Sequence, residues 1–216
     1  MEQNNNNFRN LIFVIAAIAG AGLIIYGAFF YSNPKAAEQP AAISQATEKN
    51  TQEVSFTEPF LGDLNAKVTV TEYASHLCGH CIAFAKETFP KLEEEYIKTN
   101  KIKFVYRSFP PLEVGMSLAC ANDQEKFWEY SHEAYAKGIT KEEDLKTFAG
   151  NIGLNQDQFN QCLDTAKYQS VAENWFKQGQ DAGVEGTPTF FINDKQIVGN
   201  QPYEEFRKVI EEELAK

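Results

Sequence analysis

The sequence predicts an α/β domain that contains a helical insertion and follows an N-terminal transmembrane helix. Residues 67–73 are rich in Val and Thr and alternate in polarity, which is typical of a strand, and a helical pattern follows at once. Residues 116–182 are almost wholly helical in pattern. Strand-like sequence returns at residues 186–198 before a last helix. The helical region is therefore expected between the strands of one α/β domain.

The N-terminus predicts a membrane anchor and a tether. Residues 1–10 are polar, and residues 11–31 form a run of 21 residues without a charge. At 1.5 Å per residue this run spans about 31 Å, roughly one bilayer core. It is longer than a signal-peptide core, so a retained anchor is favoured, with cleavage a few residues later as the alternative. Residues 32–54 are rich in Ala, Gln, Glu and Asn and predict a flexible linker.

Overall composition limits the classes of function. The formal net charge of −10 argues against a nucleic-acid partner, which would need a basic surface. A hydrophobic fraction of 43% with 17 Phe is enough for a substantial core. We expect the α/β domain to comprise residues 55–112 and 184–216, with the helical insertion at 113–183.

The first elements of the domain follow from local patterns. Residues 55–65, with Pro59 and a Gly-Asp pair, predict a short strand and a turn before the strand at 67–73. The helix that follows carries apolar side chains at helical spacing: Ala85, Phe89, Leu92 and Tyr96. Pro90 interrupts this helix, because proline removes a backbone hydrogen bond. Residues 102–107 alternate again and predict the next strand.

The end of the chain predicts a hairpin and a helix. Asn193 and Asp194 separate two strand-like runs, as expected for a hairpin turn. Asn200 is expected to cap the final helix, with Pro202 in its first turn.

A pair of thiols, Cys78 and Cys81, stands where the strand at 67–73 gives way to the helix. Cys78 is expected at the helix N-terminus, where unpaired N–H groups and the helix dipole stabilise a thiolate. His80 lies between the thiols, after Gly79, and its imidazole can add a favourable interaction. Cys81 is one helical turn on, close enough to form a disulfide with Cys78. This arrangement favours dithiol–disulfide exchange.

A structural zinc site is the alternative for this motif, with His76 or His80 as further ligands. A zinc site of that kind would need a second Cys or His pair, and the chain has only three histidines. The spacing therefore favours redox chemistry over metal binding.

Glu72 breaks the apolar pattern of the strand at 67–73, because it shares a face with Val68 and Val70. If that face is buried, Glu72 is an acid close to the thiols and could accept a proton from Cys81 or tune it. The alternative is an edge residue whose carboxylate reaches solvent. The pattern alone favours neither.

Two further cysteines, Cys120 and Cys162, lie in the predicted insertion. With four cysteines in all, the closeness of Cys78 and Cys81 favours the pairing of Cys120 with Cys162. A structural disulfide between two helices would add roughly 3–4 kcal/mol on the chain-entropy model. Two buried core thiols or a second redox relay are the alternatives.

The order of these features resembles the DsbA-type branch of the thioredoxin superfamily, in its membrane-tethered bacterial forms. The resemblance rests on Cys78-Gly79-His80-Cys81 after a strand, the helical insertion, and Gly186-Thr187-Pro188 before a hairpin and a last helix. It covers about residues 60–216. It implies a thioredoxin-like fold with an inserted helical domain and a protein thiol:disulfide oxidoreductase, with no metal and no cofactor other than the Cys78–Cys81 disulfide.

The same resemblance assigns roles to further residues. Pro188 would be a cis proline packed against the disulfide, and Thr187 would offer backbone groups to an extended substrate peptide. Glu72 matches the buried acid of the family, which favours its functional role. Cys120 and Cys162 match two cysteines that often pair in this branch. The chain departs from the strongest oxidases at Gly79, where those proteins carry proline.

The resulting hypothesis is a single-pass protein of a bacterial cell membrane with its catalytic domain on the extracytoplasmic side, where disulfides persist. Its Cys78–Cys81 disulfide would be passed to exported polypeptides with free thiols. A quinone-linked membrane thiol oxidase of DsbB or VKOR type would then regenerate it. The alternatives are a disulfide isomerase or reductase of the same fold, a non-redox peptide-binding chaperone module, and metal delivery through Cys78, Cys81 and His76.

Overall fold

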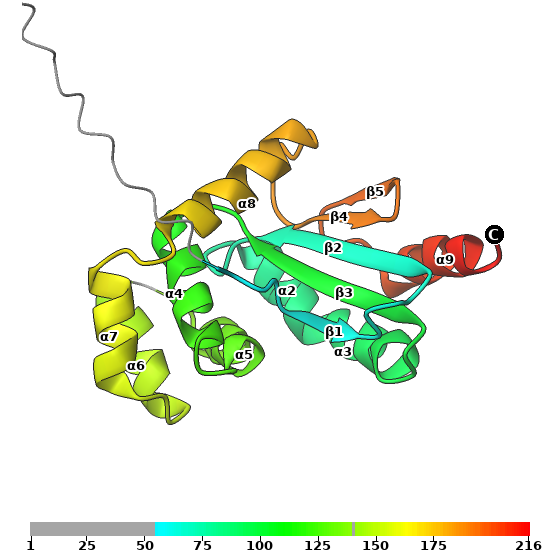
Figure 1. Ribbon diagram of the computed structural model, residues 1–216. Coiled ribbons are helices and arrows are strands. Elements are labelled where there is room, and N and C mark those ends of the chain that lie inside the picture. Colours follow the sequence, from blue (N-terminus) through cyan, green and yellow to red (C-terminus); the bar gives the residue numbers. More distant parts are fainter. Residues whose placement is uncertain (1–54, 140) are drawn as a thin grey trace, which may run out of the picture. The chain divides into compact units, whose positions relative to one another are not determined.

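The computed structural model describes residues 55–139 and 141–216 (Figure 1). The predicted N-terminal segment, transmembrane anchor and linker lie outside the described residues. Within the described ranges, no helix has both the length and the apolar character needed to span a bilayer.

The centre of the domain is a five-stranded sheet in the order β1-β3-β2-β4-β5. Its strands are β1 Phe60–Gly62, β2 Val68–Ala74, β3 Ile102–Ser108, β4 Thr189–Ile192 and β5 Lys195–Val198. The central strands β2 and β3 are parallel, and the other three pairings are antiparallel. The Val- and Thr-rich alternation therefore forms a central strand of the sheet. In this register Glu72 lies between Tyr106 of β3 and Phe190 of β4.

Helices cover the sheet and fill the connection between β3 and β4. Those before and after the insertion are α2 Gly79–Glu87, α3 Phe89–Leu92, a π-helical turn η1 Glu93–Ile97, and α9 Tyr203–Leu214. Those of the insertion are α4 Leu112–Asn122, α5 Phe127–Lys137, α6 Glu142–Asn151, α7 Gln156–Asp164 and α8 Gln169–Asp181. Figure 1 shows α4, α5, α6 and α7 grouped beside the end of the sheet where β3 finishes. The insertion therefore stands next to the end of β2 from which α2 begins.

The predicted interruption of the first helix occurs two residues before its proline. The helix divides at Thr88, between α2 and α3, and Pro90 lies at the start of α3. Proline is tolerated in a first helical turn, because the N–H that it lacks has no partner there.

The predicted cap of the final helix is wrong. Pro202, not Asn200, occupies the capping position, and α9 begins at Tyr203. Gln201 N–H instead bonds back to the carbonyl of Gly199, which keeps the turn going for two residues beyond Asn200. The fixed φ of Pro202 then starts the helix without a side-chain cap. The expected apolar stripe is present, with Phe206 and Ile210 buried.

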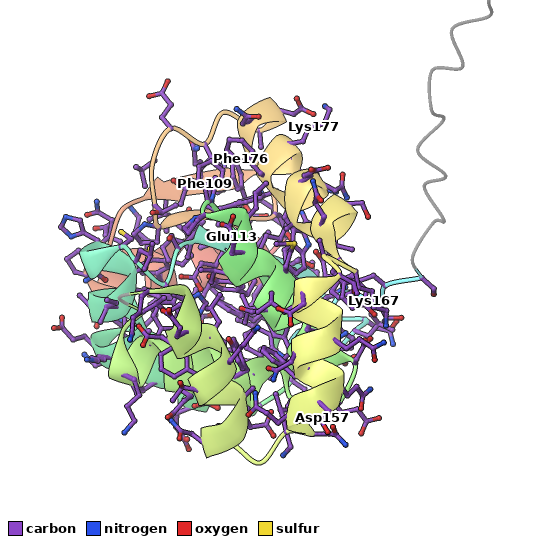
Figure 2. All side chains as sticks on the ribbon, turned by 90° about the vertical axis from the view of Figure 1, so that its left-hand side faces the viewer. Phe109, Glu113, Asp157, Lys167, Phe176 and Lys177 are labelled. Carbon is purple, nitrogen blue, oxygen red and sulfur yellow. A yellow bond between two sulfur atoms is a disulfide. The ribbon has the colours of Figure 1, made fainter. Side chains whose placement is uncertain are left out.

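The chain that leaves β3 is held against α8 of the insertion. Figure 2, which faces the insertion, shows Phe109 beside Phe176 of α8, and their ring centroids are 5.0 Å apart. Gly179, one turn further along α8, permits this approach, because a Cβ there would lie 2.7 Å from the Phe109 ring. Phe109 N–H donates to the carbonyl of Ala74 at 2.7 Å. This contact ties the insertion to the last residue of β2, just before the cysteine motif.

Candidate active site

Cys78 is the N-cap residue of α2, four residues after the end of β2. Its backbone is extended, with φ −88° and ψ 119°, and its side chain is half-buried. Its N–H donates to the carbonyl of Ser75 at 3.0 Å, and its carbonyl accepts from Ile82 N–H at 3.0 Å. Cys78 therefore stands at the N-terminus of α2, where the first N–H groups of a helix lack partners within the helix, as the sequence predicts.

The environment of Cys78 lowers its pKa below the usual value. Partial burial alone would raise the pKa, since it penalises the thiolate. Interactions of the sulfur with Thr187, with the backbone and side chain of Cys81, and with the backbone of His80 outweigh that penalty. His80 contributes through its backbone N–H, while its imidazole is exposed to solvent. The expected help from that imidazole stays a prediction.

The loop between α8 and β4 meets Cys78 from the far end of the sequence. The Thr187–Pro188 peptide bond is cis. In the thiol form Cys78 donates to the carbonyl oxygen of Thr187 at 3.1 Å. The loop is fixed by Gly199 N–H, which donates to the Pro188 carbonyl at 2.8 Å, and by Thr189 Oγ1, which donates to Gly186 at 2.7 Å. The Cys78–Cys81 motif and the loop with Thr187 and Pro188 thus form one site.

Cys81 differs from Cys78 in both burial and charge. It is fully buried, and both thiols are free of disulfides in this structure. Burial raises the pKa of Cys81 well above its usual range, and the nearby Glu72 raises it further. Cys78 therefore loses its proton more readily than Cys81 does.

Glu72 is a buried acid beneath these thiols, 4% exposed. Burial raises its pKa from the usual 4.5 to about 8, so that it holds a proton at neutral pH. The strand at 67–73 indeed buries the face that carries Val68, Val70 and Glu72. The alternative of a carboxylate reaching solvent at a sheet edge is wrong, because β2 is central and Glu72 has a neighbouring strand on each side.

His76 forms a buried polar bridge that sequence patterns did not indicate. Its Nε2 lies 3.0 Å from Ser131 Oγ of α5, and its Nδ1 lies 3.0 Å from the hydroxyl of Tyr106. The ring also stacks on Tyr135, with centroids 3.9 Å apart. Burial is the main cause that lowers the pKa of His76 to about 3, so the ring stays neutral. Ser131 is 55 residues away in sequence, and no local pattern links it to the motif.

The zinc and metal-delivery alternatives find little support in this geometry. Both ring nitrogens of His76 are already engaged by protein hydroxyl groups. Within residues 55–139 and 141–216, no three or more His, Cys, Asp and Glu side chains are placed to hold a metal ion together.

Gly79 and the second cysteine pair complete the set of predicted residues. Gly79 is exposed, and a Cβ at this position would meet nothing within 4 Å. The position therefore has room for a larger residue between the thiols. Cys120 of α4 and Cys162 of α7 form a disulfide with Cα atoms 5.9 Å apart. This disulfide joins two helices of the insertion and does not involve Cys78 or Cys81.

A sheet with two parallel central strands, a Cys-x-x-Cys pair at a helix N-terminus and a cis proline beside it define a DsbA-like protein-disulfide oxidoreductase. The family model described as thioredoxin matches residues 54–212, which is more than half of the sequence. The chain therefore belongs to the thioredoxin family.

Curated relatives agree with this class. The chain is 26% identical over 171 residues to "Disulfide bond formation protein D" of Bacillus subtilis, covering 73% of this chain and 77% of the relative. It is 30% identical over 171 residues to "Putative protein-disulfide oxidoreductase" of Rickettsia bellii, covering 71% of this chain and 65% of the relative. The chain thus spans slightly less than two thirds of that rickettsial relative.

Solved structures give the same fold. BdbD from Bacillus subtilis in its oxidised form superimposes with a TM-score of 0.68 at 24% identity, covering 74% of this chain and 94% of that chain. Alpha-DsbA1 from Wolbachia pipientis superimposes with a TM-score of 0.66 at 27% identity, covering 74% and 92%. The predicted thioredoxin-like fold with an inserted helical region is confirmed.

Proposed function

We propose that the chain is a membrane-anchored oxidase that introduces disulfides into exported polypeptides through Cys78 and Cys81. The observation that carries this proposal is the asymmetry of the two thiols. A thiolate that is stabilised at Cys78 favours the reduced enzyme, and the oxidised enzyme then gives up its disulfide readily. Each pKa unit below ambient pH is worth about 1.4 kcal/mol, or roughly 30 mV for this two-electron couple.

The first half of the reaction forms a mixed disulfide. A client thiolate attacks the half-buried Sγ of Cys78, and the bond to Cys81 breaks. Cys81 leaves as a thiolate and takes a proton from Glu72, whose raised pKa of about 8 keeps that proton available. The backbone of Thr187, within 3.1 Å of Cys78 Sγ, is placed to bind an extended client segment at this stage.

The second half releases the product. A second client thiolate attacks the client sulfur that is bonded to Cys78, and Cys78 leaves as its stabilised thiolate. The client loses two electrons and two protons in forming its disulfide. The enzyme gains both electrons and one proton. That proton restores Glu72, which gave its own to Cys81, and the other proton goes to solvent.

Partners and location follow from the same chemistry. The relative from Bacillus subtilis is named for disulfide bond formation, and exported polypeptides with free thiols are the corresponding clients for this chain. Residues 11–31 would hold the domain at the outer face of a bacterial cell membrane. A quinone-linked membrane thiol oxidase of DsbB or VKOR type would reoxidise Cys78 and Cys81.

The direct test equilibrates the full-length chain, in detergent, with glutathione redox buffers and counts reduced Cys78 by alkylation. We expect half-reduction at a potential well above that of thioredoxin, which is about −270 mV. A potential close to that of thioredoxin would contradict the oxidase.

A refolding assay separates the remaining alternatives. The oxidised chain should restore disulfides to a reduced model protein, and Cys78→Ser should abolish this activity. Rescue of a protein with scrambled disulfides would instead identify an isomerase. Refolding assistance that survives Cys78→Ser would identify a non-redox chaperone module.

A further inference from the structure

A small, partly open cavity lies between Glu72 and α5 of the insertion. It has a volume of about 20 Å³ and is lined by Glu72 of β2, Tyr106 of β3, and by Trp128, Ser131, His132 and Tyr135 of α5. The rest of its wall is apolar. A cavity of roughly 10–15 Å³ is enough for one water, so this one has room for a single molecule.

Two polar groups at the cavity lack protein partners. The carboxyl of Glu72 makes no hydrogen bond within the described part of the chain, and burial is the sole cause of its raised pKa. The indole Nε1–H of Trp128 is buried and is likewise without a partner there. A buried water usually makes two to four hydrogen bonds to groups that would otherwise be unpaired. The cavity therefore offers a water both room and partners.

His132 connects the cavity with solvent. It contributes to the wall and is itself exposed to solvent on α5. Its ring lies edge-on to Phe89 of α3, with centroids 6.0 Å apart, so it packs on a residue that also lines the cavity. An imidazole can accept and donate a proton near neutral pH, whereas the surrounding aromatic wall cannot.

We propose that one water in this cavity connects Glu72 with His132, so that protons reach and leave the Cys81–Glu72 pair through the insertion. The proposal rests on the proposed exchange of a proton between Cys81 and Glu72. During reoxidation, Glu72 first loses its proton through the water to His132 and solvent. Cys81 then passes its proton to the Glu72 carboxylate and attacks Cys78 Sγ in the mixed disulfide, and the sulfur of the partner leaves as a thiolate. During client oxidation, one proton travels the opposite way.

The other titratable groups around Glu72 do not carry its proton to solvent. Cys81 of α2, Tyr106 of β3 and Tyr135 of α5 interact with Glu72 through space, and burial raises the pKa of each of the three. His76 remains neutral between Tyr106 and Ser131. Glu129, one turn before His132, is exposed and interacts with it electrostatically. Of the groups named at this site, only His132 both lines the cavity and reaches water.

The test follows the step in which Cys81 must lose its proton. The reduced full-length chain is mixed with oxidised glutathione, and acid quenching separates the Cys78–glutathione mixed disulfide from the Cys78–Cys81 product as a function of pH. We expect His132→Leu to slow resolution of the mixed disulfide about tenfold or more near pH 7, the lower side of the usual gain from proton transfer. The glutathione equilibrium should stay unchanged. Ala136→Leu, at an exposed position on the same helix, is the matched control.

Chemical rescue separates a proton carrier from a packing residue. Free imidazole should restore the resolution rate of His132→Ala in proportion to its concentration and should leave the unmodified chain unaffected. A normal pH profile in His132→Leu, with resolution slowed in Glu72→Gln, would overturn the proton exit but leave the proposed function standing. If Glu72→Gln also resolves at the normal rate, the proton exchange between Cys81 and Glu72 is wrong as well.

Discussion

Glu72 links the active site to the stability of the fold. Its pKa is about 8 in the folded chain against 4.5 when exposed, so the folded chain keeps a proton that the unfolded chain releases between these values. Stability from this group is therefore present in full below pH 4.5 and is lost as pH rises through 8. The loss amounts to about 5 kcal/mol at most, on the order of 1.4 kcal/mol per unit.

The corresponding variant is Glu72→Gln, which has no proton to lose. We expect its free energy of unfolding, relative to the unmodified chain, to increase as pH rises from 5 to 8.5. Urea unfolding at several pH values measures this difference, and Glu87→Gln on the exposed side of α2 serves as the control. A difference that does not change with pH would mean that Glu72 ionises normally in the folded chain.

His76 is expected to matter for stability rather than for charge. Replacing it with Phe keeps a ring against Tyr135 but leaves Ser131 and the Tyr106 hydroxyl each with one partner fewer. Leaving buried polar groups unpaired costs about 1–3 kcal/mol, so His76→Phe should lower the free energy of unfolding by that amount. The exposed His80→Ala should change it by less than about 0.5 kcal/mol. Equal effects of the two substitutions would contradict the buried bridge.

At the scale of the elements, the disulfide between α4 and α7 stabilises the insertion. It closes a loop with a sequence separation of 42 residues, for which the chain-entropy model gives about 4 kcal/mol. We expect the double substitution Cys120→Ala and Cys162→Ala to lower the free energy of unfolding by roughly this amount. The glutathione equilibrium of Cys78 should not change, and a shift in that equilibrium would indicate a second redox relay.

The elements that sequence patterns predict best are those with a strong period. The alternation at 67–73 is preserved because β2 is central and one of its faces is fully buried, and the motif then starts α2 as expected. The predicted cap at Asn200 is wrong because a backbone turn and Pro202 start the helix without a side-chain cap.

The site was predictable only in part, because local sequence patterns do not show which distant residues meet in the fold. The position of Cys78 follows from the local change in sequence pattern, from strand to helix, at this point in the chain. The proximity of Thr187 to Cys78 depends on topology across 109 residues, and only the resemblance to a known family indicated it. The bridge from His76 to Ser131 and the cavity at His132 depend on how the insertion packs, which no local pattern encodes.

At the scale of the whole molecule, the preference of Cys78 for the thiolate links redox state to folding. A thiolate that is stabilised only in the folded chain makes the folded chain favour reduction more than the unfolded chain does. The reduced chain should therefore unfold at a higher urea concentration than the chain with a Cys78–Cys81 disulfide. Mass spectrometry must show that Cys120–Cys162 stays bonded in both samples. A more stable oxidised chain would contradict this linkage.

The measurement that bears most directly on this mechanism is the pH dependence of alkylation at Cys78. The reduced full-length chain is treated with iodoacetamide from pH 3 to 10, and the modified peptides are quantified separately for Cys78 and Cys81. We expect Cys78 to react with a midpoint clearly below that of free cysteine, near 8.5, while Cys81 stays unmodified across the neutral range. A midpoint for Cys78 at or above that of free cysteine would contradict the thiolate on which the proposed oxidase depends.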